Sequence, residues 1–300
     1  MSEHKFKLIH NFEEILARPY FVESAHISSG DDGIRLEDLL GHYQFKEKVK
    51  CGIAQCGTKH QKGYVVKLTN GTEIIIGHVC GKRKFGVDFT DKEREFKAQR
   101  IHADQFQTMK DTFEKLSELK QKFEDVMTQT GKLTFIDIKM GIKSLQSEAF
   151  DYWMNQKIKR QVTANGAITE ERFKTDQERE LEEEVKQGYG RGTSVSDTKV
   201  VTVALIDDYD LISQWYEADK LRNYFERMHR EIRDPAGMPN DVFKKLIRDL
   251  KEYDHNLTLL KSFCVRGNRL LIQENILKFG YLFNKPDELR KVQQFAEKYS

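Results

Sequence analysis

The sequence predicts a mainly α-helical fold, with long helices in coiled-coil-like antiparallel packing and a small zinc-bound β-hairpin module near the N-terminus. Three observations support this prediction. Prolines are rare, 4 in 300 residues, so long helices need not be interrupted. Apolar residues recur at alternating three- and four-residue spacings near the C-terminus, as on the seam of a helix pair. Cysteines and histidines gather in residues 51–85, around an Asn-Gly pair.

Three regions follow from these patterns. Residues 1–45 are expected to form a helix-and-loop segment that packs on the zinc module, with helix-like spacing of apolar residues over 34–40. Residues 46–89 form the predicted zinc-binding module. Residues 90–300 form the predicted helical domain, which contains a flexible glycine-rich loop at 188–194.

The composition favours a soluble protein. Apolar residues make up 38% and charged residues 33% of the chain. No run of apolar residues is long enough for a membrane span, so none is expected. The N-terminal segment lacks the apolar core of a signal peptide. We therefore expect a cytoplasmic protein, in which thiolates stay reduced and disulfides are disfavoured.

Residues 63–77 carry a β-hairpin signature. Two apolar runs, Gly63–Leu68 and Glu73–Gly77, flank Asn70-Gly71, a dipeptide typical of a tight hairpin turn. The hairpin folds the chain back on itself, so the residues before it and after it meet at its open end. Pairing outward from the turn predicts three opposed pairs: Val66 with Ile75, Gly63 with His78, and Gln61 with Cys80.

The residues at the open end of this hairpin form a candidate zinc site. Of the 4 cysteines in the chain, Cys51, Cys56 and Cys80 lie here, with His60 and His78 beside them. Thiolates and imidazoles are the ligands that Zn²⁺ takes in structural sites. We expect one structural Zn²⁺ per chain, held by the three cysteines and either His60 or His78, in a zinc-finger layout that resembles a treble clef or a zinc ribbon. Three ordinary buried cysteines are the alternative.

The same region is strongly basic. Residues 46–86 contain nine Lys or Arg against two Glu, a local charge of +7, while the whole chain carries +2. A concentrated positive surface attracts polyanions, nucleic acid first among them. A solvated face that keeps the module soluble is the alternative. The residues expected to contact DNA or RNA, single- or double-stranded, are Lys59, Lys62, Tyr64, Lys82, Arg83, Lys84 and Phe85.

Two apolar stripes predict long helices that pack together. Thr90 and Glu93 form a capping-box pattern, from which one helix should run to about residue 130 with a stripe over 106–126. A second helix, opened by Asn240, carries a seam of apolar residues. We expect the two stripes to pack antiparallel within one chain, or else to mediate self-association. The seam of the second helix comprises Phe243, Leu246, Leu250, Tyr253, Leu257, Leu260 and Cys264.

An acidic cluster is the one candidate for catalysis. Asp207, Asp208 and Asp210 follow a β-branched run over 200–206 that is predicted to be a strand. Carboxylates at a strand end can hold Mg²⁺, as in a nuclease, whereas helix capping is the simpler explanation. The chain contains no nucleophile elbow, phosphate-binding loop or dinucleotide motif. The sequence therefore favours a non-catalytic nucleic-acid-binding protein, with a protein-interaction scaffold and a metal-dependent nuclease as alternatives.

Overall fold

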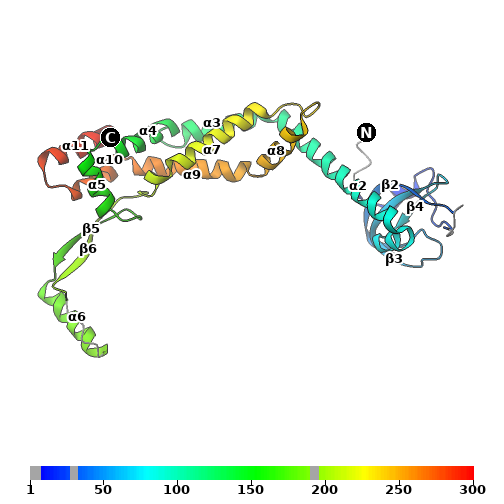
Figure 1. Ribbon diagram of the computed structural model, residues 1–300, viewed down its shortest axis with the longest axis horizontal. Coiled ribbons are helices and arrows are strands. Elements are labelled where there is room, and N and C mark those ends of the chain that lie inside the picture. The colour runs from blue at the N-terminus through cyan, green and yellow to red at the C-terminus, as the bar shows by residue number, and fades with distance from the viewer. Residues whose placement is uncertain (1–7, 28–32, 190–195) are drawn as a thin grey trace. The chain divides into compact units, whose positions relative to one another are not determined.

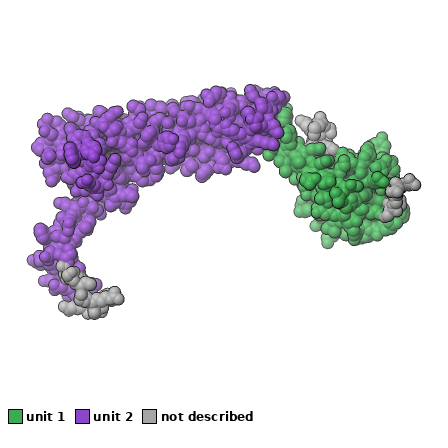
Figure 2. Space-filling view, viewed as in Figure 1, with its two compact units in different colours: residues 1–111 green, residues 112–300 purple. Residues whose placement is uncertain are grey.

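The computed structural model describes residues 8–27, 33–189 and 196–300, with side chains over the same ranges except 186–189. The chain divides into two compact units, residues 1–111 and residues 112–300, which Figure 2 shows in different colours. Each unit has its own secondary structure (Figure 1). No described helix is long and apolar enough to cross a membrane.

Unit 1, residues 1–111, is built on a four-stranded sheet. Its elements are β1 Leu8–Ile9, α1 Phe12–Leu16, β2 Leu36–Lys50, β3 Lys59–Leu68, β4 Glu73–Ile76 and α2 His78–Glu114, the last of which runs past the end of the unit. The strand order is β1-β2-β3-β4. β1 runs parallel to β2, and the other neighbouring strands are antiparallel.

β2 occupies a segment for which the sequence predicted a helix, and that prediction is wrong. Leu36 and Leu39 are both buried in the same cluster although they are three residues apart, a spacing typical of a helix. In the structure, the pairing of β2 with β3 shifts between Leu36 and Asp38, as at a β-bulge. The irregularity turns both leucines to one side of the sheet. A bulged strand therefore imitates helical spacing.

β3 and β4 form the predicted hairpin, but in a different register. The sequence predicted Val66 opposite Ile75, but Val65 lies there in the structure. The cause is the loop, in which Gly71 N–H donates to Leu68 C=O (2.8 Å) and Leu68 N–H donates to Thr72 C=O (2.9 Å). The turn therefore contains three residues rather than two. Gly71 has a φ of 85°, the left-handed conformation that such a loop requires and that glycine adopts without strain.

The predicted pairs of His78 and Cys80 with β3 do not form, because β4 ends before them and both residues lie in α2. α2 therefore begins well before the predicted start at Thr90. It is interrupted at Gly86, whose φ of 57° and ψ of −123° are non-helical and are available mainly to glycine. The predicted helix to residue 130 is also divided, since a new helix begins at Leu116.

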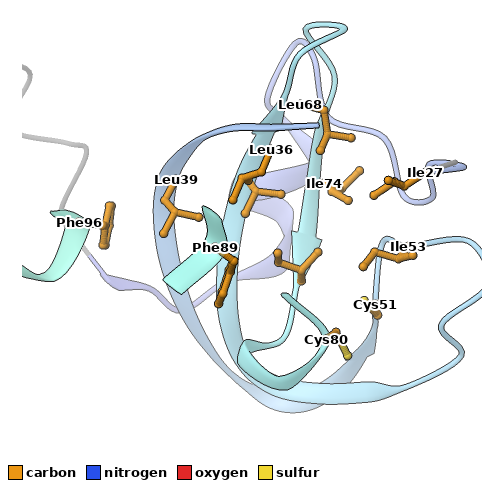
Figure 3. Close-up of a cluster of buried hydrophobic side chains, with 12 residues drawn as sticks. Ile27, Leu36, Leu39, Cys51, Ile53, Leu68, Ile74, Cys80, Phe89 and Phe96 are labelled. Carbon is orange, nitrogen blue, oxygen red and sulfur yellow. The ribbon is translucent and has the colours of Figure 1, made fainter. Parts of the chain in front are cut away.

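Both faces of the sheet in unit 1 are covered. Val66 belongs to a large cluster with Leu39 and Phe89, all completely buried. Figure 3 shows this cluster, with Leu39 and Phe89 labelled, enclosed by the curved strands and the start of α2. The preceding residue, Val65, belongs to a second cluster that contains Tyr43. Successive residues of a strand point to opposite faces, so each face has its own apolar layer. Unit 1 thus has a core of its own.

Unit 2, residues 112–300, is mainly helical and contains one two-stranded ribbon. Its elements are α3 Leu116–Gln129, α4 Phe135–Ser147, α5 Tyr152–Gln161, β5 Ala167–Phe173, α6 Asp176–Tyr189, β6 Thr198–Leu205, α7 Leu211–Glu231, α8 Asn240–Lys251, α9 Tyr253–Leu270, α10 Gln273–Leu277, the 3₁₀ helix η2 Lys278–Leu282 and α11 Pro286–Glu297. β5 and β6 pair antiparallel, which confirms the strand predicted over 200–206. Of the predicted glycine-rich loop, Gly188 and Tyr189 end α6, and the remainder lies outside the described residues.

The predicted antiparallel packing of the two long stripes is wrong. The seam is divided between α8 and α9, and α9 runs parallel to α3. Tyr253 Oη donates to Leu119 C=O (2.9 Å) near the start of both helices. Asn268 Nδ2 donates to Leu133 C=O (3.2 Å) near the end of α9 and just beyond α3. Both pairs advance along the chain in the same direction, so the two helices are parallel.

The antiparallel partner of α9 is α7. His229, near the end of α7, lies 3.3 Å from Tyr253 at the start of α9 (Nε2 to Oη), and Arg266 near the end of α9 pairs with Asp210 before α7. The chain turns back between α7 and α8, so helices adjacent in sequence become neighbours in space. Most of the seam is buried within the unit; its buried members are Phe243, Leu246, Tyr253, Leu260 and Cys264.

Candidate metal centre

Three cysteines from separate elements of unit 1 come together at one end of its larger cluster. Cys51 directly follows β2, Cys56 lies in the loop between β2 and β3, and Cys80 lies in the first turn of α2. Figure 3 shows Cys51 and Cys80 side by side at the edge of the apolar side chains. The loop is closed by Cys51 N–H donating to Thr58 C=O (2.9 Å). The chain therefore brings the predicted thiols to one place.

The geometry of these thiols fits a metal ion. The three Sγ atoms lie within 4.8 Å of one another, and Cys56 Sγ is 3.3 Å from Cys80 Sγ. Metal–sulfur bonds of about 2.3 Å in a tetrahedron place two sulfurs about 3.8 Å apart. All three cysteines are free thiols. Cys51 and Cys80 are buried and Cys56 is partly exposed, so the group could hold a metal ion with one side turned toward solvent.

The two histidines expected to supply a fourth ligand are not part of this group of thiols. His60 lies on β3, and its Nδ1 is 2.8 Å from Tyr43 Oη. Its Nε2 is buried and has no hydrogen-bond partner among the described residues. His78 lies on α2, and its Nδ1 is 2.8 Å from Glu93 Oε1.

The predicted hairpin register extended the second strand through His78 and Cys80, whose two-residue spacing would place them on one strand face. On a helix, residues two apart point to nearly opposite sides, because each residue turns the helix by about 100°. This is why Cys80 reaches the thiol group while His78 faces Glu93. The assignment of His78 as a ligand therefore depended on a strand that the structure does not contain.

The three thiols differ in how readily they ionise. Burial raises the pKa of Cys51 to about 12, and burial together with Cys56 raises the pKa of Cys80. Burial alone would also raise the pKa of Cys56, but hydrogen bonds from the Thr58 hydroxyl and amide and from the other two thiols lower it to about 7. Arg83 Nη2 also donates to Cys56 Sγ (3.1 Å). A cation bound by the group would favour the thiolate form of all three.

Exposed basic side chains lie next to the thiols in the chain. Lys50 precedes Cys51, and its register partner across the strands is Lys59. Lys82 and Arg83 follow Cys80 on α2 and are exposed. None of these four, nor Lys46, Lys48 or Lys62, forms an ion pair with a described residue. Because these cations have no such partners, the surface carries uncompensated positive charge. The paired lysines Lys50 and Lys59 also repel each other, as like charges on directly paired strand positions do.

Three residues expected to contact nucleic acid are placed differently from the rest. Lys84 is half-buried and its Nζ donates to Ile27 C=O (2.7 Å). Tyr64 packs its ring edge-on against Phe89 at 5.8 Å, and its hydroxyl donates to Glu93 (2.8 Å). Phe85 packs against the larger buried cluster. These three side chains have packing or hydrogen-bond partners within unit 1, and the rings of Tyr64 and Phe85 are partly buried.

The acidic cluster of unit 2 is neutralised within the protein. Arg266 and Arg269 both donate to Asp208 (2.7 and 2.8 Å), and Arg266 also pairs with Asp210. Lys278 pairs with Asp207 (2.8 Å). Asp210 stands at the N-terminus of α7 but makes no side-chain capping bond. The carboxylates therefore act as ion-pair partners, and Asp210 does not act as a side-chain cap.

Sequence reasoning missed a second polar cluster in unit 1. Glu93 was interpreted as part of a capping box, yet it is almost completely buried and accepts hydrogen bonds from Tyr64 and His78. Arg100 Nη1 lies 3.1 Å from His42 Nε2. These residues come from β2, β3 and α2, and no spacing along the chain relates them.

Comparison with protein-family models, curated proteins and solved structures finds no match to this chain. Function must therefore be argued from the residues themselves.

Proposed function

We propose that unit 1 is a nucleic-acid-binding module whose basic surface is held in place by a structural Zn²⁺ on Cys51, Cys56 and Cys80. The observation that supports it most is the set of exposed, uncompensated lysines and arginine next to the three thiols. Two paired positions, Lys50 and Lys59, place like charges opposite each other. A phosphate between them would relieve their repulsion.

Zinc is the metal that suits this donor set. Thiolates are soft ligands, and Zn²⁺ bound by several of them forms closed, redox-inactive structural sites. Of the two histidines, His60 is the better fourth ligand, because its Nε2 is buried and has no hydrogen-bond partner among the described residues, whereas the His78 ring faces Glu93. Such a site joins the end of β2, its following loop and the start of α2. The thiolates require a reducing compartment, as in the cytoplasm.

Recognition would be of the phosphate backbone rather than of bases. The surface offers lysine ammonium groups, while the rings of Tyr64 and Phe85 are partly buried and pack against the larger cluster. Contacts to phosphates position a strand without reading its sequence. We therefore expect binding that falls steeply with salt and varies little with sequence.

The test is electrophoretic binding to single- and double-stranded DNA and RNA across a salt series, with zinc measured on the same sample. The triple substitution Lys50→Gln, Lys59→Gln, Lys82→Gln should lower the slope of log affinity against log salt by about 2 to 3, since each lost phosphate contact removes about 0.7 to 0.9. The matched control is Lys122→Gln, Lys261→Gln, Lys285→Gln in unit 2, which removes the same charge. Equal effects of the two triples, or no binding by the wild type, would refute the proposal.

A second candidate function is association with a protein partner through unit 2. The ribbon and α6 expose large apolar side chains: Phe173 (77%), Val200 (69%) and Leu181 (62%). A lone two-stranded ribbon is only marginally stable in water, and exposed apolar side chains of this kind are typical of interfaces. Self-association is the first case to measure, by sedimentation of the wild type and of Phe173→Ser with Val200→Ser after nuclease treatment. Identical monomeric sedimentation of both proteins would argue against it.

A further inference from the structure

A cleft of about 350 Å³ lies in unit 1, and none of the described cysteines lines it. Its lining comes from β1, β2, β3 and α2, so both the sheet and the helix shape it. The polar residues at its wall include His42, Lys62, Tyr64, His78, Glu93 and Arg100. The volume is within the range of small-ligand sites, and the lining combines two cationic side chains with one carboxylate.

The one carboxylate among the lining residues is already satisfied. Glu93 has a side chain only 6% exposed, and it accepts hydrogen bonds from Tyr64 Oη, His78 Nδ1 and Lys97 Nζ, each at 2.8 Å. Burial alone would raise the pKa of Glu93, but these donors lower it below its ordinary value. Glu93 is therefore a carboxylate that orients His78 and Tyr64 at the wall.

Arg100, another lining residue of the cleft, keeps an uncompensated charge. Its Nη1 is 3.1 Å from His42 Nε2, and since a guanidinium can only donate, Nε2 must accept and the ring must be neutral. Burial and the charge of Arg100 lower the pKa of His42, while Asp104 opposes them. Arg100 forms no ion pair with any carboxylate in the described part of the chain. It thus has guanidinium donors left for a ligand.

Lys62 adds a second free cation at the rim. It is exposed, it pairs with Gln44 across the strands, and it makes no ion pair with a described residue. Two free cations together match the charge of a compact dianion, and the His78 ring, oriented by Glu93, lines the cleft beside them. A phosphate monoester has this charge, and its oxygens fit the planar fork of an arginine.

We propose that this cleft binds a phosphate monoester, either that of a free mononucleotide or the terminal phosphate of a nucleic-acid strand. In the second case the inference rests on the proposed function, because Lys62 belongs both to the cleft and to the basic surface. In the first case it is independent of that function. Arg100 is the principal ligand of the phosphate, and Glu93 acts as a positioning residue through His78.

The test compares a short oligonucleotide with a 5′-phosphate and the same oligonucleotide with a 5′-hydroxyl, together with AMP and inorganic phosphate as competitors. The wild type should bind the phosphorylated strand about tenfold or more tightly, as expected for charge-assisted hydrogen bonds. Arg100→Gln should reduce this preference to less than about twofold, by the same reasoning. The matched control Arg94→Gln removes an exposed charge from the same helix, where Arg94 pairs only with Asp91, and should keep the preference.

Binding of AMP that displaces no strand indicates a nucleotide site, whereas competition between AMP and the 5′-phosphorylated strand indicates a shared site. The result that overturns the proposal is equal affinity of the wild type for both strands together with no binding of AMP or phosphate. If Arg100→Gln fails to fold, His78→Gln and the shift of the wild-type arginine side-chain NMR signals on adding AMP decide the question. Salt-sensitive binding of strands without a phosphate preference would remove the cleft proposal and leave the basic surface intact.

Discussion

Removal of the proposed Zn²⁺ should destabilise unit 1 and leave unit 2 unchanged. The chain offers a matched pair of cysteines to test this, since Cys80 belongs to the thiol group and Cys264 to the core of unit 2. Their exposed fractions are 3% and 1%. Replacing either residue with alanine therefore loses a similar amount of apolar burial, on the order of 1 kcal/mol.

The proposed Zn²⁺ would add to the free energy of unfolding of unit 1, over and above this apolar burial. Zn²⁺ at one hundred times its dissociation constant should raise the free energy of unfolding of unit 1 by about 2.7 kcal/mol, because it binds the folded state only. Cys80→Ala should abolish most of this dependence on zinc. Cys264→Ala should keep it in full, since that thiol lies in unit 2, outside the metal group.

Two probes report the units separately. The 2 tryptophans of the chain, Trp153 and Trp215, both belong to unit 2, so their fluorescence follows the unfolding of that unit. Amide hydrogen exchange of β3 and β4 follows unit 1. Denaturant titrations with zinc and with a chelator, read by both probes, give the two free energies of unfolding.

Three outcomes would refute the reasoning. The first is exchange in β3 and β4 that is the same with zinc and with chelator. The second is a zinc effect that survives in Cys80→Ala. The third is loss of the zinc effect in Cys264→Ala with unit 2 still folded, which would mean that the thiols of the two units are not independent.

Three further predictions concern packing, pH and the acidic cluster. Gly63→Ala should cost unit 1 about 3 kcal/mol or more in a denaturant titration, because a Cβ there would lie 2.1 Å from the carbonyl oxygen of Ile76; an unchanged stability would contradict the packing described. Burial, aided by the charge of a nearby lysine, lowers the pKa of His229 from 6.5 to about 4, so its contribution to stability is complete above pH 6.5 and is lost as the pH falls toward 4. The loss should reach about 3 kcal/mol by tryptophan fluorescence, and His229→Phe should flatten this dependence. Asp208 has a φ of 55° and two arginine partners, so Asp208→Ala should destabilise unit 2 by about 1 to 3 kcal/mol. Asp208→Gly relieves the backbone strain and should recover part of that loss, while full recovery would show that the ion pairs contribute nothing.

Much of the local structure could be predicted because the signal lies within a few neighbouring residues. The Asn-Gly turn gave the hairpin, the β-branched run gave β6, and apolar periodicity indicated the helices of unit 2. The hairpin register could not be predicted, since Gly71 can serve a two- or a three-residue loop and only the hydrogen bonds around it distinguish them. The bulge in β2 likewise produced a spacing that a helix shares.

Parallel or antiparallel packing of α9 was also beyond the sequence. A seam of apolar residues indicates that one face of a helix is buried. It does not indicate which neighbour covers that face or in which direction the neighbour runs. The short connection after α7 places that helix antiparallel to α9, and α3 takes the remaining parallel position.

The sequence alone determined which thiols are candidates for a metal, because ligand chemistry belongs to residue type and three cysteines near one hairpin have few other uses. Only the tertiary structure decided that His78 faces Glu93 and not the thiols, since a side chain's direction depends on whether its backbone is helix or strand. The cleft with His42 and Arg100 was likewise decided by tertiary structure. Its residues are distant along the chain, and only the packing of α2 on the sheet brings their charges together.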